Sequence, residues 1–149
     1  MDILQFEPQS KSFDRILLFD VIEHIPIEKH VALFQRLAPW MHDDSLLLIN
    51  LPNPGYILYD QKNNPTVLQE IDQPVYIATL ATALSSAFLD IVKVETWSAW
   101  VKDDYQFIIA RKRKAFEEHF LSRDRNIFQK GIGWLQRKWR KLIYRYPPV

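Results

Sequence analysis

Three residues close together in the sequence, Asp20, Glu23 and His24, carry the side chains best suited to chemistry. They directly follow the apolar run 16–19. An imidazole titrates near neutral pH, so His24 is a candidate general base for a hydroxyl group. A purely structural interpretation also stands: the two carboxylates cap the helix that follows, and the imidazole fills a polar gap. The residue types alone leave both interpretations open.

A second polar group follows the next apolar run, 45–51, and consists of Asn53, Tyr56 and Tyr59. In open α/β sheets, ligands bind beyond the carboxyl ends of the strands. Both runs end in polar residues, so we expect the two groups to face one crevice. The alternative for the tyrosines is a surface loop in which their rings pack on the body of the protein.

The elements that position these groups follow an α/β pattern. The runs 16–19 and 45–51 lack the alternation of half-buried strands, which predicts strands buried on both faces. Helical spacing over 27–38 predicts a helix between them, with Pro26 near its first turn and Pro39 limiting its end. The order strand, helix, strand fits a parallel crossover unit.

The following residues extend this pattern. Residues 55–73 show few periodic apolar positions and are predicted to form a loop, after which Pro74 opens another helix. Two strands, 91–97 and 105–110, follow with a short turn between them, which predicts an antiparallel pair. The apolar positions of the predicted helix are Tyr76, Leu80, Leu84 and Phe88.

The segment 13–25 carries a family resemblance. It reads Phe-Asp-Arg-Ile-Leu-Leu-Phe-Asp-Val-Ile-Glu-His-Ile and resembles the fourth-strand motif of class I S-adenosylmethionine (SAM) dependent methyltransferases. The run 47–53, Leu-Leu-Ile-Asn-Leu-Pro-Asn, resembles the fifth strand of that family, and the antiparallel pair resembles its reversed last strand. The resemblance covers residues 1–112. It implies an α/β fold, a partial Rossmann-like three-layer sandwich with parallel strands and an antiparallel last strand.

The resemblance implies SAM as the cofactor and assigns roles to residues. Asp20 and its backbone neighbours would lie near the methionine part of SAM, and Asp2 would face the adenine amino group. The implied cofactor-binding residues are Asp2, Ile3, Phe19, Asp20 and Val21. The implied substrate-binding residues are Glu23, His24, Asn53, Tyr56 and Tyr59, with His24 as the catalytic candidate.

The glycine-rich turn of the family has no counterpart in this sequence. That turn, Gly-x-Gly-x-Gly, follows the first strand and holds SAM, whereas the three glycines here are at 55, 131 and 133. We therefore expect the C-terminal half of a methyltransferase domain, which binds SAM only when the other half is restored. The expected reaction is methyl transfer to a small molecule or a glycan precursor.

Two other functions remain as alternatives. A non-catalytic module derived from a methyltransferase would bind a separate N-terminal half, a second copy or a membrane, because strand 15–20 has an open edge. A nicotinamide-dependent oxidoreductase shares the layer pattern, but the Asp-Val-Ile-Glu-His-Ile run and the antiparallel ending favour the methyltransferase.

Residues 113–149 are predicted to form a separate basic tail. Residues 1–110 contain 7 basic and 15 acidic residues, whereas residues 111–149 contain 12 basic and 3 acidic ones. Apolar residues recur at helical spacing over 127–146, which predicts a basic amphipathic helix. This helix suits a membrane surface or docking on the acidic body; RNA is the least favoured partner.

The composition excludes several classes of site. The chain has no cysteine, which rules out disulfides and thiolate metal sites. The four histidines, at 24, 30, 42 and 119, do not form a ligand cluster, so we expect no metal. The first residues lack the pattern of a signal peptide, and no apolar run is long enough to span a membrane. We expect a cytoplasmic protein, peripheral at a membrane if the tail binds lipid.

Overall fold

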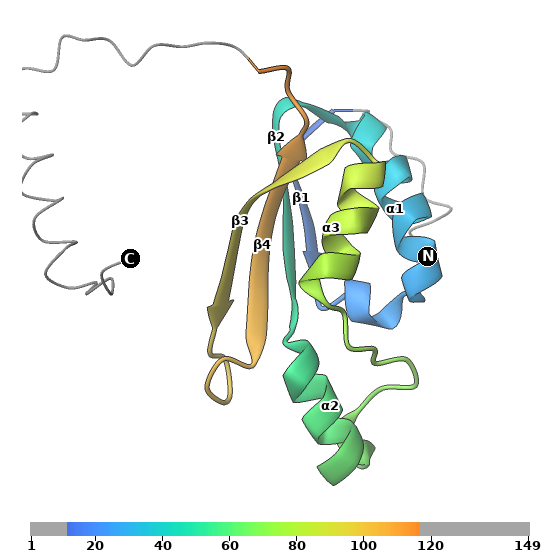
Figure 1. Cartoon of the computed structure of the whole chain (residues 1–149), viewed down its shortest axis with the longest axis vertical. Coiled ribbons are helices and arrows are strands. Elements are labelled where there is room, and N and C mark those ends of the chain that lie inside the picture. Colours follow the sequence, from blue (N-terminus) through green and yellow to red (C-terminus); the bar gives the residue numbers. More distant parts are fainter. Residues whose placement is uncertain (1–11, 117–149) are drawn as a thin grey trace, which may run out of the picture. The chain divides into compact units, whose positions relative to one another are not determined.

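The computed structural model describes residues 12–116, which form one mixed sheet with helices against it (Figure 1). The order of the strands across the sheet is β1-β2-β4-β3. β1 and β2 are parallel, and β4 runs antiparallel to both of its neighbours. The predicted partial Rossmann-like sheet with a reversed last strand is therefore confirmed. The strands are β1 (Phe13–Phe19), β2 (Met41–Pro52), β3 (Leu89–Trp97) and β4 (Tyr105–Lys112).

The helices are α1 (His30–Leu37), α2 (Pro54–Asn63) and α3 (Ile77–Ser86). Short 3₁₀ turns at Ile27–Lys29 and Ala38–Trp40 extend α1 at both ends, so the helix predicted over 27–38 is confirmed. α3 begins three residues after Pro74, at Ile77, because its N-cap residue Tyr76 is still extended. Gln73, directly before Pro74, donates from its backbone to the carbonyl of Glu23. The remaining 3₁₀ turns are Ile22–His24 and Pro65–Val67.

The prediction of a loop throughout 55–73 was wrong, because α2 occupies its first half. Asn53 is the N-cap of α2, since its side-chain oxygen accepts a hydrogen bond from the N–H of Gly55 at 2.9 Å. Pro54 occupies the first helical position, where its missing N–H and restricted φ cost nothing. The Pro-Asn-Pro-Gly segment thus ends a strand and begins a helix. The amphipathic pattern of α2 is too weak for periodicity to find it.

α1 and α3 cover one face of the sheet and form the core with it (Figure 1). Leu33, Phe34 and Leu37 of α1 are buried, as are Leu47 and Ile49 of β2. Burying a large apolar side chain contributes about 1.5–3 kcal/mol, so this layer holds the sheet and helices together. α2 stands apart from the layer, beyond the carboxyl end of β2 (Figure 1).

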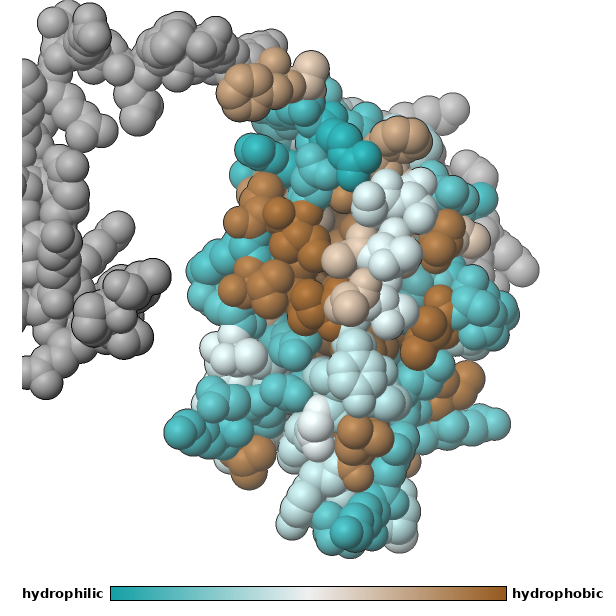
Figure 2. Space-filling view, in the orientation of Figure 1, coloured by the Kyte–Doolittle hydropathy of each residue, from teal (hydrophilic) through white to brown (hydrophobic). Residues whose placement is uncertain are grey.

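The opposite face of the sheet is uncovered within residues 12–116, and we call it the open face. The prediction that β1 is buried on both sides was wrong, because Leu18 is 2% exposed but Leu17 is 55% and Phe19 is 47% exposed. Strand register places Leu17 beside Leu48 and Ile109, and Phe19 beside Asn50 and Phe107. Figure 2 shows apolar side chains gathered over β3 and β4. Val94 of β3 is 44% exposed but pairs with the buried Ile108, so it lies on the same face of the sheet as the helices and not on the open face.

The chain divides into two units, residues 1–114 and 115–149, and the described residues belong almost entirely to the first. The implied cofactor residues Asp2 and Ile3 lie outside the described residues, as does the helix predicted over 127–146. The predicted tail and its boundary at 112/113 stay predictions. Within residues 12–116, no helix has the length and apolar character needed to cross a bilayer.

Candidate functional site

The tip of β1 adopts an unusual backbone conformation at the predicted site. Asp20 has a φ of 52°, in the left-handed region that residues with a Cβ rarely enter. Its N–H donates to the carbonyl of Asn50 at 2.9 Å, which ties the end of β1 to β2. Directly beyond this tie, the chain turns through Ile22–His24. Asp20 and Glu23 are thereby held at the carboxyl edge of the sheet.

A pocket of about 350 Å³ opens at this edge, and we call it the acidic pocket. Polar and aromatic side chains from the ends of β1 and β2, from α2, from residues 67–72 and from the β3–β4 turn surround it. The lining residues are Asp20, Glu23, His24, Pro52, Tyr56, Asp60, Val67, Leu68, Gln69, Asp72, Trp100 and Tyr105. The ends of the first two strands therefore line one crevice, but of the second predicted polar group only Tyr56 faces it.

Glu23 is the most deeply buried acid of the acidic pocket, at 2% exposure. Within the described part of the chain, its Oε2 atom is buried and has no hydrogen-bond partner. Burial is the main reason that its pKa rises from 4.5 to about 7, and the negative charges of Asp20 and Asp72 raise it further. A hydrogen bond to backbone and the charge of His24 act in the opposite direction. Glu23 is therefore poised to exchange a proton near neutral pH.

His24 is fixed through one of its ring nitrogens. Nδ1 lies 2.6 Å from the carbonyl oxygen of Ile71 and 2.9 Å from the Oδ1 of Asp72. Both partners accept hydrogen bonds, so Nδ1 carries the proton and donates it. Nε2 lies 3.8 Å from Oε1 of Glu23, which is beyond hydrogen-bond distance. The ring of His24 thus presents Nε2, rather than Nδ1, for chemistry.

Two side chains brace the loop that carries Glu23 and His24. The buried His30 bonds through Nε2 to the carbonyls of Ile22 and Ile25, at 3.1 and 2.8 Å. Gln73 donates from its backbone to the carbonyl of Glu23 at 3.2 Å and from its side chain to that of Ile25 at 2.8 Å. Residues far apart in the sequence therefore position the loop.

Two tyrosines in the acidic pocket bond to carboxylates. The Tyr105 hydroxyl bonds to Asp20, and burial followed by the charge of Asp20 raises the pKa of Tyr105 to about 12. Burial likewise raises the pKa of Tyr56, and the neighbouring carboxylate of Asp60, to which its hydroxyl bonds, adds to the shift. Both tyrosines therefore stay protonated at neutral pH and act as hydrogen-bond donors.

The β3–β4 turn is held by Asp104, which is 1% exposed. Its carboxylate accepts hydrogen bonds from the N–H groups of Ala99, Trp100 and Val101, at 2.7, 2.8 and 3.1 Å. Burial opposes its ionisation, but these backbone donors outweigh that effect and lower its pKa. Asp104 thus fixes the backbone of Trp100, which forms one wall of the acidic pocket.

The residues predicted from sequence separate into distinct places. Asp20, Glu23, His24 and Tyr56 line the acidic pocket. Asn53 does not line it: besides capping α2, it donates from Nδ2 to the carbonyl of Asp103 at 3.0 Å. Tyr59 is 58% exposed and also lies outside the pocket lining. The sequence reasoning did not include Asp60, Asp72, Trp100 and Tyr105, which no local motif connects to the pocket.

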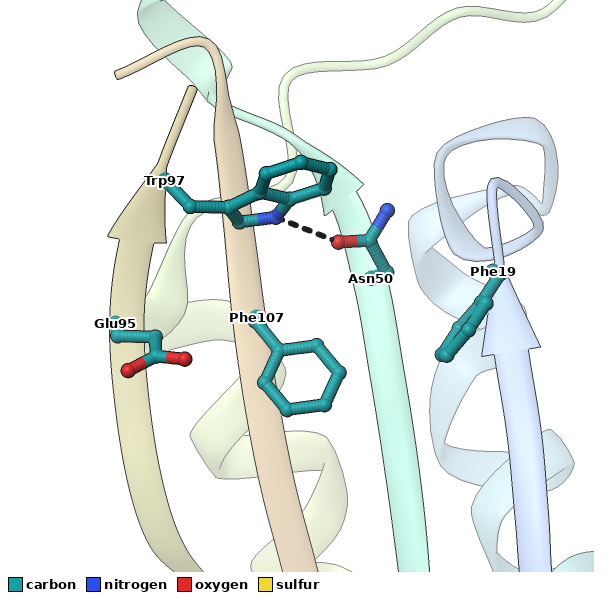
Figure 3. A pocket seen from close by; sticks show the side chains of 5 residues that line it. All are labelled: Phe19, Asn50, Glu95, Trp97 and Phe107. Atoms are coloured by element: carbon teal, nitrogen blue, oxygen red, sulfur yellow. Dashed lines mark hydrogen bonds between the residues drawn. The ribbon is translucent and has the colours of Figure 1, made fainter. Parts of the chain in front are cut away.

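The other two predicted cofactor residues lie away from the acidic pocket. Val21 packs against the hydrophobic core. Phe19 lines a second hollow, of about 440 Å³, on the open face of the sheet (Figure 3). There its ring meets that of Phe107 edge to face, with ring centres 6.3 Å apart. Across the hollow, the indole N–H of Trp97 donates to Oδ1 of Asn50 at 2.9 Å.

Among residues 12–116, no group of three or more histidine, aspartate or glutamate side chains is arranged to hold a metal ion.

Comparison with known proteins gives matches in structure only: no family model and no curated protein matches the sequence. A SAM-dependent methyltransferase from Methanosarcina mazei matches with a TM-score of 0.62 and 12% identity, over 76% of this chain and 65% of that chain. A SAM-dependent methyltransferase from Archaeoglobus fulgidus matches with a TM-score of 0.61 and 21% identity, over 75% and 66%.

A third solved structure is the magnesium protoporphyrin IX methyltransferase of Synechocystis PCC 6803 with bound SAH. It matches with a TM-score of 0.56 and 18% identity, over 75% of this chain and 48% of that chain. The chain thus spans less than two thirds of the length of each of these three proteins. The described residues have the fold of class I SAM-dependent methyltransferases, over part of its extent.

Proposed function

We propose that this chain is part of a SAM-dependent methyltransferase that acts on a small-molecule or glycan-precursor acceptor in the cytoplasm. The observation that carries the proposal is the acidic pocket at the carboxyl ends of β1 and β2, where open α/β sheets bind their ligands. The shared fold with methyltransferases supports the reaction class.

The side chains at the tip of β1 fit a positively charged cofactor. When bound, SAM supplies a methyl group on a positively charged sulfur. The carboxylate of Asp20 favours a positive charge nearby. Asp20 would orient the cofactor, and Glu23, His24 and Tyr56 would orient the acceptor. Holding donor and acceptor in line accounts for much of the rate of such reactions.

The direct test is to titrate SAH into the polypeptide that the genomic locus produces, including any in-frame segment upstream of Met1. We expect a strand and a glycine-rich turn upstream, and binding at least 100-fold tighter than to residues 1–149 alone. Asp20→Asn should weaken binding about ten-fold, because a carboxylate facing the bound cation is lost. Asp43→Asn, which removes an exposed acid from β2, is the control. An extended chain that carries the turn and binds no SAH would contradict the proposal.

The open face supports the same proposal from a different direction. Leu17, Phe19 and Phe107 form an apolar surface next to β1, which is an edge strand in the sheet of the described residues. Such surfaces and edges are normally covered in soluble proteins. We propose that the remaining polypeptide of the methyltransferase fold covers this face, either as an upstream segment or as a separate N-terminal half. About a third or more of each of these solved methyltransferases lies outside the part that matches this chain.

Leu17→Lys distinguishes a covered from an uncovered face. In residues 1–149 alone we expect it to change the free energy of unfolding by less than about 0.5 kcal/mol, because Leu17 is 55% exposed. In the extended polypeptide, Leu17→Lys should lower the free energy of unfolding by at least about 2 kcal/mol, because the covered face would bury the lysine charge. Urea unfolding measures both. The control, Leu58→Lys on α2, starts at 45% exposure and should be neutral in both.

Three results would assign the open face differently. If Leu17→Lys is neutral in the extended polypeptide as well, that polypeptide does not cover the face. If residues 1–149 form a dimer that Leu17→Lys dissociates in size-exclusion chromatography, the non-catalytic alternative of self-association is favoured. Binding of residues 1–149 to anionic vesicles that is lost with Leu17→Lys would favour a membrane.

A further inference from the structure

We propose that the acidic pocket takes a protonated primary amine, and that Oε2 of Glu23 accepts a hydrogen bond from its nitrogen. This inference rests on the proposed function and deepens it, since it identifies the methyl acceptor as an amine. The observations that support it concern the side chains that line the acidic pocket.

The charge of the pocket selects for a cation. Four carboxylates line it, those of Asp20, Glu23, Asp60 and Asp72, whereas no lysine or arginine of the described residues does. Asp72 is committed to His24, and Asp60 accepts a hydrogen bond from Asn64 at 3.0 Å. An anionic ligand would be repelled by these carboxylates, and a ligand without a hydrogen-bond donor would leave Oε2 of Glu23 without a partner.

Glu23 supplies the specific contact for such a cation. It is 2% exposed, and the buried Oε2 lacks a hydrogen-bond partner within residues 12–116. A buried carboxylate oxygen without a partner is costly, so a donor from a ligand stabilises it. His24 does not fill this position, because its Nδ1 is bonded elsewhere and its Nε2 is 3.8 Å from the other oxygen. An ammonium group supplies three donors in a compact volume.

Aromatic walls add to the preference for a cation. Tyr56, Trp100 and Tyr105 line the pocket together with the carboxylates. The faces of aromatic rings attract cations, especially where water is partly excluded. A volume of about 350 Å³ is enough for an amine that carries one ring.

The proposed chemistry balances without any group beyond the cofactor. An ammonium nitrogen has no lone pair, so one N–H proton must first move to the carboxylate of Glu23. The freed lone pair then forms the new N–C bond with the methyl carbon of SAM. The C–S bond breaks, and its electron pair stays on sulfur, which becomes the neutral thioether of SAH. Glu23 is thus the proton acceptor, and a carboxyl group that titrates near neutral pH suits this role.

The test is an NMR titration of residues 1–149 with benzylamine and, as its neutral counterpart, benzyl alcohol. At pH 8 we expect benzylamine to bind about ten-fold more tightly, with shifts in the Trp100 indole resonance. Glu23→Gln should weaken benzylamine binding at least five-fold and change benzyl alcohol binding less than two-fold. The control, Glu28→Gln, removes the same charge from an exposed position and should change neither. Equal affinity of the wild-type chain for both compounds would overturn the inference.

The pH dependence provides a second readout that needs no substitution at Glu23. Benzylamine stays protonated from pH 6 to 8, whereas Glu23 ionises in this range. The charged or titratable groups that face Glu23 are Asp20, His24, Asp72 and Tyr105. We expect benzylamine affinity to increase at least five-fold from pH 6 to 8 and to do so in His24→Gln as well. A flat profile, or loss of the increase in His24→Gln, would contradict the role of Glu23.

The outcome is separable from that of the proposed function, because no SAM is present in these titrations. Failure of SAH to bind the extended polypeptide would leave a selective amine site intact. Conversely, if the extended polypeptide binds SAH but residues 1–149 do not prefer benzylamine over benzyl alcohol, the methyltransferase proposal stands and an amine acceptor is excluded. Displacement of benzylamine by SAM from residues 1–149 would assign the acidic pocket to the cofactor and overturn the inference.

Discussion

Glu23→Gln is expected to stabilise the protein by about 3 kcal/mol at pH 8 and by less than about 1 kcal/mol at pH 5. The pKa of this carboxyl is about 7 in the folded protein, against 4.5 for an unperturbed group. Between pH 4.5 and 7, the carboxyl group of Glu23 keeps its proton in the folded state but has released it in the unfolded state. Stability therefore decreases as the pH rises from 4.5 to 7, by about 1.4 kcal/mol for each unit of the pKa difference.

Glutamine avoids this loss because it keeps the shape of the protonated side chain and never ionises. Urea unfolding of the wild-type and Glu23→Gln proteins at pH 5 and pH 8 measures the effect. Glu28→Gln changes an exposed acid on the same segment and should show no such difference between the two pH values. A Glu23→Gln protein that exceeds the wild type equally at both pH values would show that ionisation of Glu23 is not the cause. The instability of the empty pocket is what a bound cation would relieve.

Asp104→Ala is expected to destabilise the protein by about 3 kcal/mol at pH 7, because three buried backbone donors lose one ionised acceptor. The folded-state pKa of Asp104 lies below its usual 3.8. Its contribution is therefore complete above the unfolded-state pKa and is lost as the pH falls through the lower folded-state value. Urea unfolding at pH 7 and pH 3 should show the difference between wild type and variant shrinking at the acid pH.

Asp103→Asn is the matched control for Asp104→Ala. Asp103 is the neighbouring residue, has a φ of 58° that asparagine tolerates, and is exposed. We expect its substitution to change stability by less than about 0.5 kcal/mol. An Asp104→Ala protein as stable as this control would show that the turn does not depend on its carboxylate. Since Asp104 fixes the backbone of Trp100, its loss should also weaken the selectivity of the pocket for benzylamine.

The sheet and half of the site could be predicted from the sequence because the signals are local. Apolar runs indicated β1 and β2, and the short connection before Tyr105 indicated the antiparallel strand. Asp20, Glu23 and His24 were found because one turn carries all three. By contrast, Asp60, Asp72 and Trp100 reach the same pocket from separate segments without a periodic pattern, so only the tertiary fold connects them.

The errors of prediction also have physical causes. Most of α2 falls in the segment 55–73 predicted to be a loop, although Asn53 followed by Pro54 is the signature of a helix N-terminus. Phe19 was assigned to the cofactor along with Asp20, although its side chain lies on the open face of β1 with Leu17, opposite to Leu18. An apolar run predicts that a strand has two apolar faces. It does not show whether other residues of the described segment cover both of those faces.

The strand order has a consequence for how this protein emerges from the ribosome. Among residues 12–116, β4 is the last strand in the sequence, yet it lies between β2 and β3 in the sheet. Within the described sheet, β3 pairs with β4, so it has no hydrogen-bonding neighbour until residues 105–112 have been synthesised. Until then β2, which pairs with β1 on its other side, lacks a neighbour on this side, and the nascent chain exposes the unpaired β3 and one open edge of β2. Release of β4 from the exit tunnel is therefore the event that closes the sheet, and translational pausing before it would prolong the interval in which chaperones or other nascent chains can bind.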